Sequence, residues 1–444
     1  MDLVWPEGEE FDDRAKLLRE ELPNLEAELN TSIRLVRKDS GVGPRWVCRI
    51  DPDHDGPAVL RRDSELIESV GRTHEEMWET FSLRHTWLRT GADASASDAA
   101  DLDEAVDRII NEVGFTYPAF ALRGLNWDKL CDHYAPLVLA ADDPLAVCQE
   151  WVAQLGDAHT AVHSTPRHVP LPYAASMTTL VRVPEGSVAW EAGVRPGWRL
   201  HAPRAEEMTR RTGASPHMHP YLVGRRLLSG QAHVEAEWRA FGPDGADVTW
   251  VEAPTGLPYG DLVTWHRRNG VGHVRLKQWV AGAGIADALD EALAELADCE
   301  ELALDLRGNV GGNVVLARAT RDRFLHEETL LGSVRYSIGN KLSEPVPMIG
   351  CPADGARWHG RLTVLTDAMT YSASEDFLLG LQGLDHVRVV GEPSGGGSGR
   401  PRVVRLLPGW SITISTVLTY DRNGHCVENA GVPVDSASTS RQWR

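Results

Sequence analysis

Residues 361–382 read RLTVLTDAMTYSASEDFLLGLQ, and the fold is organised around this strand-to-helix step. The apolar run at 361–366 is typical of a buried strand, and the apolar run that starts at Phe377 is typical of a helix. Between them, Ser372 and Glu375 have the spacing of a capping box, which makes Ser372 a helix cap. A hydroxyl at such a step also lies beside backbone N–H groups and the positive end of the helix dipole, where an oxyanion is stabilised. The same serine is therefore also a candidate nucleophile.

Strand and helix signals alternate through residues 262–444, and this pattern predicts an α/β domain. The strand-like runs are GHVRLKQW, LALDLRG, RLTVLT and VRVVGE, and predicted helices at 285–299, from about Asn313 and from about Ser374 separate them. Such an alternation predicts a sheet with right-handed crossovers. Near the end of the chain, Asn423-Gly424 predicts a hairpin turn.

The residues before 262 divide into two further regions. Residues 1–165 are predicted to form a mainly helical N-terminal domain, because apolar residues recur at helical spacing in 102–113 and 143–156, although RWVCRI around Cys48 has strand character. Residues 175–258 carry short β-like runs and turns, which predict a small β-rich module.

Composition excludes several classes of protein. The chain has 444 residues, 42% of them hydrophobic and 25% charged, which is typical of a soluble protein with two to four domains. Its formal net charge of −19 argues against nucleic-acid or anionic-membrane partners. The start lacks a secretory pattern and no stretch reaches the roughly 20 apolar residues of a membrane span, so we expect a cytoplasmic protein. Oligomerisation has no support in the sequence.

The six cysteines are far apart and form no CxxC pair, so we expect reduced core residues. Asp51, Asp53, Asp55 and Gly56 resemble half of a calcium loop, but Arg62 stands where the bidentate Glu is required, which favours a solvated turn. His159 and His163 have a zinc-like spacing, but they follow a helix-ending glycine and enclose no Glu, so a metal site is disfavoured. No metal or organic cofactor is expected.

Three segments resemble, in order and spacing, the core of the tail-specific or C-terminal processing serine peptidases. They are LALDLRGNVGGN, VLTDAMTYSASEDF and VRVVGEPSGGG. The superfamily includes the tricorn protease core and interphotoreceptor retinoid-binding protein. Two further segments belong to the resemblance: EGSVAWEAGVRPGWRL is similar to the PDZ signature of these proteases, and LGDAHT is similar to a segment of the tricorn-like branch. The resemblance implies a crotonase-like α/β core at 262–444 and a PDZ-like module at 175–258.

The resemblance also implies a set of site residues. Ser372 matches the nucleophile, and Ala373, Gly311 and Gly312 match the segments that supply the oxyanion hole. Relatives with a Ser-Lys dyad place the lysine in the loop where this chain has Gly395–Gly397, and Arg400 cannot replace it because a guanidinium does not deprotonate near neutral pH. The tricorn-like pattern instead implies His159 as general base, at the end of the N-terminal domain, and Glu428 as its partner. Asp157 is expected to hold the turn that presents His159.

Three functions remain open from the sequence. The first is a serine peptidase that hydrolyses a peptide or protein substrate through an acyl-enzyme on Ser372. The second is a biosynthetic enzyme that transfers or cyclises the acyl group. The third is a binding protein that keeps the fold without turnover, as the retinoid-binding relatives suggest.

Overall fold

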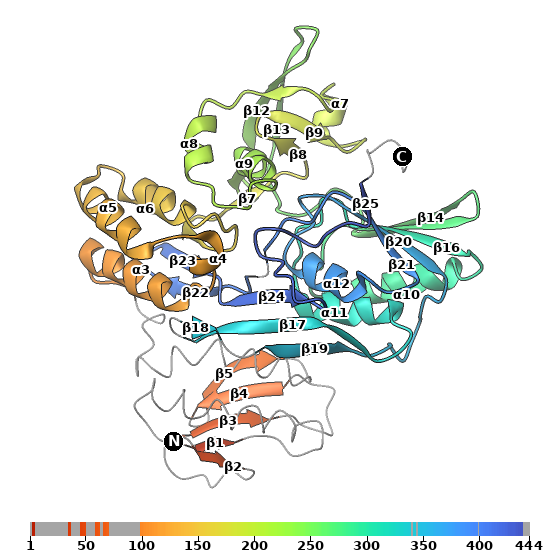
Figure 1. Cartoon of the computed structure of the whole chain (residues 1–444). Helices are drawn as coiled ribbons and strands as arrows, with labels where there is room; N and C mark the ends of the chain where they lie inside the picture. The colour runs from red at the N-terminus through yellow and green to blue at the C-terminus, as the bar shows by residue number, and fades with distance from the viewer. Residues whose placement is uncertain are drawn as a thin grey trace.

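The computed structural model describes residues 98–437, apart from 339–340, 343–344 and 398, together with five strands between residues 2 and 70 (Figure 1). Those five strands form one sheet in the order β2-β1-β3-β4-β5. Their bounds are β1 Asp2–Val4, β2 Arg34–Val36, β3 Arg45–Arg49, β4 Ala58–Arg62 and β5 Glu65–Val70. The strand predicted around Cys48 is therefore confirmed. The described elements before residue 98 are strands, whereas the helices expected at 102–113 and 143–156 are present after them. That residues 1–165 as a whole form a mainly helical domain stays a prediction.

Four helices follow this sheet in the described part of the chain. They are α3 Leu102–Thr116, α4 Phe120–Arg123, α5 Trp127–Ala140 and α6 Pro144–Ala153. Helix α6 starts as predicted, because the Asp143 side chain accepts a hydrogen bond from Ala146 N at 3.1 Å and Pro144 occupies the first turn. Pro136 lies inside α5 without ending it.

The helices do not have a hydrophobic core of their own. Their buried faces pack in one cluster with Val404, Leu406, Ile412 and Ile414 from far along the chain. Strand β6, Ala161–Ser164, pairs with β23, Trp410–Ile414, which also pairs with β22, Arg402–Arg405. The boundary predicted at residue 165 therefore runs through a packed unit that includes C-terminal strands.

The predicted β-rich module lies at the top of Figure 1, drawn in yellow and green. Its main sheet has the order β13-β12-β10-β9-β8, and β11 pairs with β7 beside it. Its elements are β7 His168–Pro170, β8 Ala174–Ser176, β9 Thr179–Arg182, α7 Val188–Glu191, β10 Arg199–Leu200, α8 Ala205–Arg210, α9 His219–Leu227, β11 Ser229–Gln231, β12 Ala236–Phe241 and β13 Asp247–Glu252.

A six-stranded sheet in the order β14-β15-β16-β20-β21-β25 forms the α/β core. Its pairs are parallel except for β14 with β15. The strands are β14 Val263–Arg268, β15 Val271–Leu276, β16 Glu301–Asp305, β20 Arg361–Thr366, β21 Val387–Gly391 and β25 Ser436–Ala437. Helices α10 Ile285–Glu295, α11 Val314–Arg321 and α12 Ala373–Leu381 connect them in chain order, with a short 3-10 turn, η1 Asp322–Phe324, after α11. The predicted alternation of strands and helices is confirmed.

A second sheet completes the C-terminal half. Long strand β17, Thr329–Ile338, pairs with β18 Lys341–Leu342, β19 Val346–Gly350 and β24 Val417–Asp421. The turn predicted at Asn423-Gly424 follows β24, where Gly424 N donates to Asp421 O at 3.0 Å and Gly424 adopts a φ of 83°.

Helix α12 lies at the centre of the core. All its residues are buried, from Ala373 to Leu381, and Phe377 packs against Trp279 and Phe324. Because the run FLLGL is apolar on every side, this helix can be surrounded by protein, which fixes the position of its first turn. Across the described part of the chain, no helix is long and apolar enough to cross a membrane.

Among the cysteines, Cys131, Cys148 and Cys299 are free and buried, as expected. Cys426 is free and half-buried, and Cys351 is exposed rather than in the core.

Candidate active site

Ser372 connects β20 to α12 and adopts a backbone conformation that L residues rarely hold. Its φ is 61° and its ψ is −122°. The predicted capping box is present, and its glutamate arm accepts from Ser372 N at 2.9 Å through Glu375 Oε2. The Ser372 hydroxyl also lies 2.9 Å from His159 Nε2. A strained serine at a strand-to-helix turn, with its hydroxyl beside an imidazole, has the geometry of an activated nucleophile.

His159 reaches this hydroxyl from the loop after α6, and Asp157 holds that loop in place. Asp157 is buried, and its carboxylate accepts from His159 N at 2.9 Å, Thr160 Oγ1 at 2.6 Å and Ser415 Oγ at 2.5 Å. These bonds fix the histidine backbone relative to Ser415, in the short connection between β23 and β24. The expected positioning by Asp157 agrees with this geometry.

The other ring nitrogen of His159 has a partner that the sequence did not indicate. The hydroxyl of Tyr371 lies 2.8 Å from His159 Nδ1, and the two rings stack with centroids 4.6 Å apart. Glu428, the residue expected there, is buried and accepts from Arg123 Nη2 at 2.6 Å. The position beside His159 Nδ1 is therefore taken by the Tyr371 hydroxyl, and the Glu428 carboxylate binds Arg123 on α4.

Burial determines the charge states at this site. It lowers the pKa of His159 below 6.5, and the carboxylates of Asp157 and Asp376 oppose that shift. Burial, followed by the charges of Asp157 and Glu428, raises the pKa of Tyr371 well above 10. Near neutral pH the pair therefore consists of a neutral imidazole and a neutral phenol, and His159 is available as a base.

The expected oxyanion-hole segments lie against the serine, with one correction. A Cβ on Gly311 would lie 2.6 Å from Tyr371 O and 3.0 Å from Ser372 Cβ, so only glycine permits this approach. Gly311 N, however, donates to Asn309 Oδ1 at 3.0 Å, so that donor is already used. Within the described residues, Ala373 N and Gly312 N have no hydrogen-bond acceptor. These two groups remain available as donors.

Glu375 binds the glycine-rich loop to the first turn of α12. Its Oε1 accepts from Ser394 Oγ and Gly396 N at 2.7 Å each, and its Oε2 accepts from Gly397 N and Ser372 N at 2.9 Å each. Burial raises the pKa of Glu375 to about 7, and these four donated bonds oppose the shift. One buried carboxylate thus ties the loop to the serine.

The glycines of that loop are required because a side chain would not fit at their positions. A Cβ would lie 2.6 Å from the Tyr371 ring if added to Gly395, 2.1 Å from the Tyr371 hydroxyl if added to Gly397, and 2.2 Å from His159 Nδ1 if added to Gly399. The loop therefore lies directly on the His159–Tyr371 pair, where any larger residue would collide with it.

The metal-like signals do not form sites in the described part of the chain. His159 contacts Ser372 and Tyr371, and His163 Nε2 contacts Thr413 Oγ1 at 3.0 Å. No group of three metal-ligating side chains occurs among the described residues. The calcium-like segment at Asp51–Gly56 lies outside them.

Tyr371 and the buried carboxylate functions of Glu375 were missed from the sequence. Tyr371 precedes the nucleophile, but nothing in its neighbours indicates that its hydroxyl turns toward a histidine more than two hundred positions earlier. Glu375 was assigned only to the capping box, because the loop that it binds begins about twenty residues later.

Comparison with known proteins finds a family match for the C-terminal part of the chain and a shared fold. The family model of peptidase family S41 matches residues 270–438. Mature CPAF complexed with lactacystin is similar over 76% of this chain and 93% of that chain, with 13% identity and a TM-score of 0.58. The photosystem II D1 C-terminal processing protease is similar over 77% of this chain and 94% of that chain, with 18% identity and a TM-score of 0.52.

At these identities the two solved structures show that the fold is shared. The tricorn protease matches 88% of this chain and 39% of that chain, with 14% identity and a TM-score of 0.37. No curated protein matches this chain.

Proposed function

Residues 270–438 of this chain belong to peptidase family S41, and on that premise we propose that the protein is a serine peptidase that forms an acyl-enzyme on Ser372. The observation that carries this proposal is the 2.9 Å separation of Ser372 Oγ and His159 Nε2 at a strained backbone position. Substrates are peptides or proteins, as the family implies.

In this mechanism His159 takes the proton of Ser372 as Oγ attacks the substrate carbonyl, and later gives it to the leaving amine. For Nε2 to accept, the proton of the neutral imidazole must reside on Nδ1, where it is donated to the Tyr371 oxygen. Tyr371 thereby takes the orienting position for which the resemblance implied Glu428. The carboxylates of Asp157 and Asp376, which raise the His159 pKa, stabilise the imidazolium that forms.

Ala373 N and Gly312 N are the proposed donors to the oxyanion, each worth on the order of 3 kcal/mol in the transition state. Gly311 supports them by letting the chain pass close to Ser372. Asp157 and Glu375 act through the residues that they hold.

The crotonase-like description of the core, the PDZ-like description of residues 175–258 and a cytoplasmic location belong to the same proposal. A PDZ-like role is supported by the five-stranded sheet of that module and by the sequence resemblance at 185–200.

The test is labelling with a fluorophosphonate, read as intact protein mass. We expect one adduct on the wild type and none on Ser372→Ala. The matched control is Ser374→Ala, two positions along, whose hydroxyl is buried and donates to Asn309 O at 2.8 Å; it should keep the adduct. A folded wild type that stays unlabelled and converts no peptide would favour a binding protein over an enzyme.

Hydrolysis and acyl transfer are separated by running the reaction on casein peptides in ¹⁸O-labelled water. Hydrolysis places one ¹⁸O in each new carboxyl group, whereas transfer to an amine gives products without the label. An unlabelled product would overturn the hydrolytic part of the proposal and leave the nucleophile in place.

A further inference from the structure

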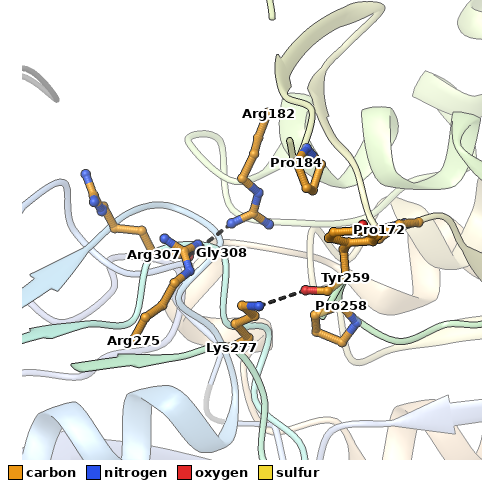
Figure 2. Close-up of a pocket in the computed structure, with 9 residues that line it drawn as sticks. All are labelled: Pro172, Arg182, Pro184, Pro258, Tyr259, Arg275, Lys277, Arg307 and Gly308. Carbon is orange, nitrogen blue, oxygen red and sulfur yellow. Dashed lines mark hydrogen bonds between the residues drawn. The ribbon is translucent and has the colours of Figure 1, made fainter. Parts of the chain in front are cut away.

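A cavity of about 170 Å³ lies between the β-rich module and the α/β core (Figure 2). Four cationic side chains line it: Arg182 at the end of β9, Arg275 on β15, Lys277 just after β15, and Arg307 after β16. Figure 2 shows Arg182 reaching toward the loop at Gly308 and Lys277 reaching toward Tyr259, while Pro172, Pro184, Pro258 and Tyr259 line the other side. Arg225 lines the adjoining hollow.

The cationic side chains of this cavity outnumber the carboxylates that form salt bridges with them in the described part of the chain. Asp305 serves two of them, with Arg275 and Arg307 each at 2.8 Å. Arg182 Nη1 donates to Arg307 O at 3.4 Å, and Lys277 Nζ donates to Tyr259 O at 2.7 Å. Within the described part of the chain, neither forms a salt bridge. A carbonyl satisfies a hydrogen bond but does not neutralise a charge.

The pKa shifts agree with this imbalance. Burial first, and then the charges of Arg275 and Arg182, lower the pKa of Lys277, although the Asp261 carboxylate opposes the shift. Burial and the charge of Arg275 likewise lower the pKa of Arg182, although Asp367 and Asp305 attract it. A bound anion would relieve this repulsion. The chain as a whole has a net charge of −19, so this cavity is a region of positive electrostatic potential on an otherwise acidic protein.

The cavity adjoins the candidate active site. Gly308 forms part of its lining, and the hollow beside it is lined by Gly308 and Val310. The next residue, Gly311, lies against Ser372. A Cβ on Gly308 would lie 2.8 Å from the Arg182 guanidinium, so this glycine lets the cation approach the loop that leads to the nucleophile.

We propose that this cavity binds a carboxylate group of the substrate, a short distance along the chain from the bond that is cleaved. The inference rests on the proposed function. Guanidinium groups match carboxylate oxygens in pairs, and Lys277 adds a point charge. A volume of about 170 Å³ accommodates an acidic side chain or a chain end, since a water molecule takes roughly 30 Å³. The carboxylate belongs either to an Asp or Glu side chain or to the substrate's C-terminus.

The test digests a defined pool of synthetic peptides with the full-length protein and maps every cut by mass spectrometry. The pool contains each sequence in matched forms: Glu or Gln at each position, and a free or amidated C-terminus. Cuts at a fixed distance from Glu that disappear with Gln identify a side-chain carboxylate. Cuts at a fixed distance from the C-terminus that disappear on amidation identify the terminal carboxylate. Cutting that is indifferent to both changes would overturn the proposal.

Variants of the cavity residues test whether the cavity causes the preference for carboxylate-bearing peptides. Arg182→Gln and Lys277→Gln should each lower kcat/KM for the carboxylate-bearing peptides by about tenfold or more, and leave the matched neutral peptides unchanged. Lys129→Gln removes the same charge from an exposed position on α5 and should change neither. Fluorophosphonate labelling confirms that each variant remains folded and active. Equal losses on charged and neutral peptides would overturn the proposal.

A binding experiment tests the cavity separately from the proposed peptidase activity. The Ser372→Ala protein is immobilised and the same pool is passed over it, so no cleavage is needed. Retention of carboxylate-bearing peptides that is lost in Ser372→Ala/Arg182→Gln supports the cavity even if the wild type cuts nothing. No retention together with no cleavage overturns both proposals.

Discussion

Ser372 occupies a conformation that disfavours every residue except glycine, and the surrounding chain maintains it. Such a position costs on the order of 1–3 kcal/mol. Both Ser372→Ala and Ser372→Gly remove the hydroxyl, so the difference in stability between the two variants measures the backbone strain at this position. We expect the glycine variant to be about 1 kcal/mol more stable than the alanine variant in chemical unfolding, with both inactive. Equal stability, or a more stable alanine variant, would show that φ of 61° is not strained here.

The loss of activity at low pH should report the protonation of His159. Its folded pKa is lowered below 6.5, so the neutral base is present above that folded value and is lost as pH falls through it. We therefore expect the midpoint of the acid limb of kcat/KM to lie below pH 6.5. Because the unfolded chain takes up the proton first, this group also lowers stability as pH falls below 6.5. An acid limb above pH 6.5 would contradict a buried histidine facing Tyr371, Asp157 and Asp376.

Tyr371 is a positioning residue, because it acts through His159. Tyr371→Phe keeps the stacked ring and removes the hydroxyl that lies 2.8 Å from Nδ1. We expect kcat to fall roughly 10- to 100-fold with KM unchanged, comparable to the loss of other general-base support. The control, Tyr134→Phe on α5, stands outside the site and should leave kcat unchanged. A purely structural role for Tyr371 would instead lower the unfolding temperature and leave kcat of the folded fraction intact.

At the scale of elements, the first turn of α12 and the glycine-rich loop form one unit through Glu375. The carboxylate accepts four hydrogen bonds, and Glu375→Gln would direct an NH₂ group toward two of the donors. We expect stability to fall by about 2–4 kcal/mol and labelling of Ser372 to slow. The control is Glu392→Gln, an exposed glutamate just before the same loop. A Glu375 variant as stable as the control would contradict this account.

At the scale of the whole molecule, the Arg123–Glu428 pair joins α4 to the segment after β24. Both side chains are almost fully buried, with 8% and 2% exposed. Arg123→Leu would remove the ion-pair partner of a buried carboxylate and should destabilise the protein by about 3–5 kcal/mol, while Arg123→Leu/Glu428→Leu should recover much of that loss. Thermal unfolding checks both. A double variant no more stable than the single one would mean that the pair contributes more than charge compensation.

Local patterns were sufficient where neighbouring residues decide the structure. The alternation after residue 262, the capped start of α6 and the turn at Gly424 were predicted because periodicity, caps and turn residues act over a few positions. The N-terminal region was harder to predict from local patterns. The helices expected at 102–113 and 143–156 are present, whereas the described elements before residue 98 are strands, so a mainly helical domain over 1–165 stays a prediction.

Residue patterns alone predict the α/β core and the strand-to-helix step at Ser372, and the family resemblance adds His159. These predictions depend on local spacing and on short sequence motifs. The folded structure was needed to show that Tyr371 contacts His159 Nδ1, that Arg123 binds Glu428, and that Arg182 and Lys277 reach one cavity. Each of these contacts joins residues far apart in the chain. Their distance is set by the packing of α3–α6 on the C-terminal strands and of the β-rich module on the core, which no short segment encodes.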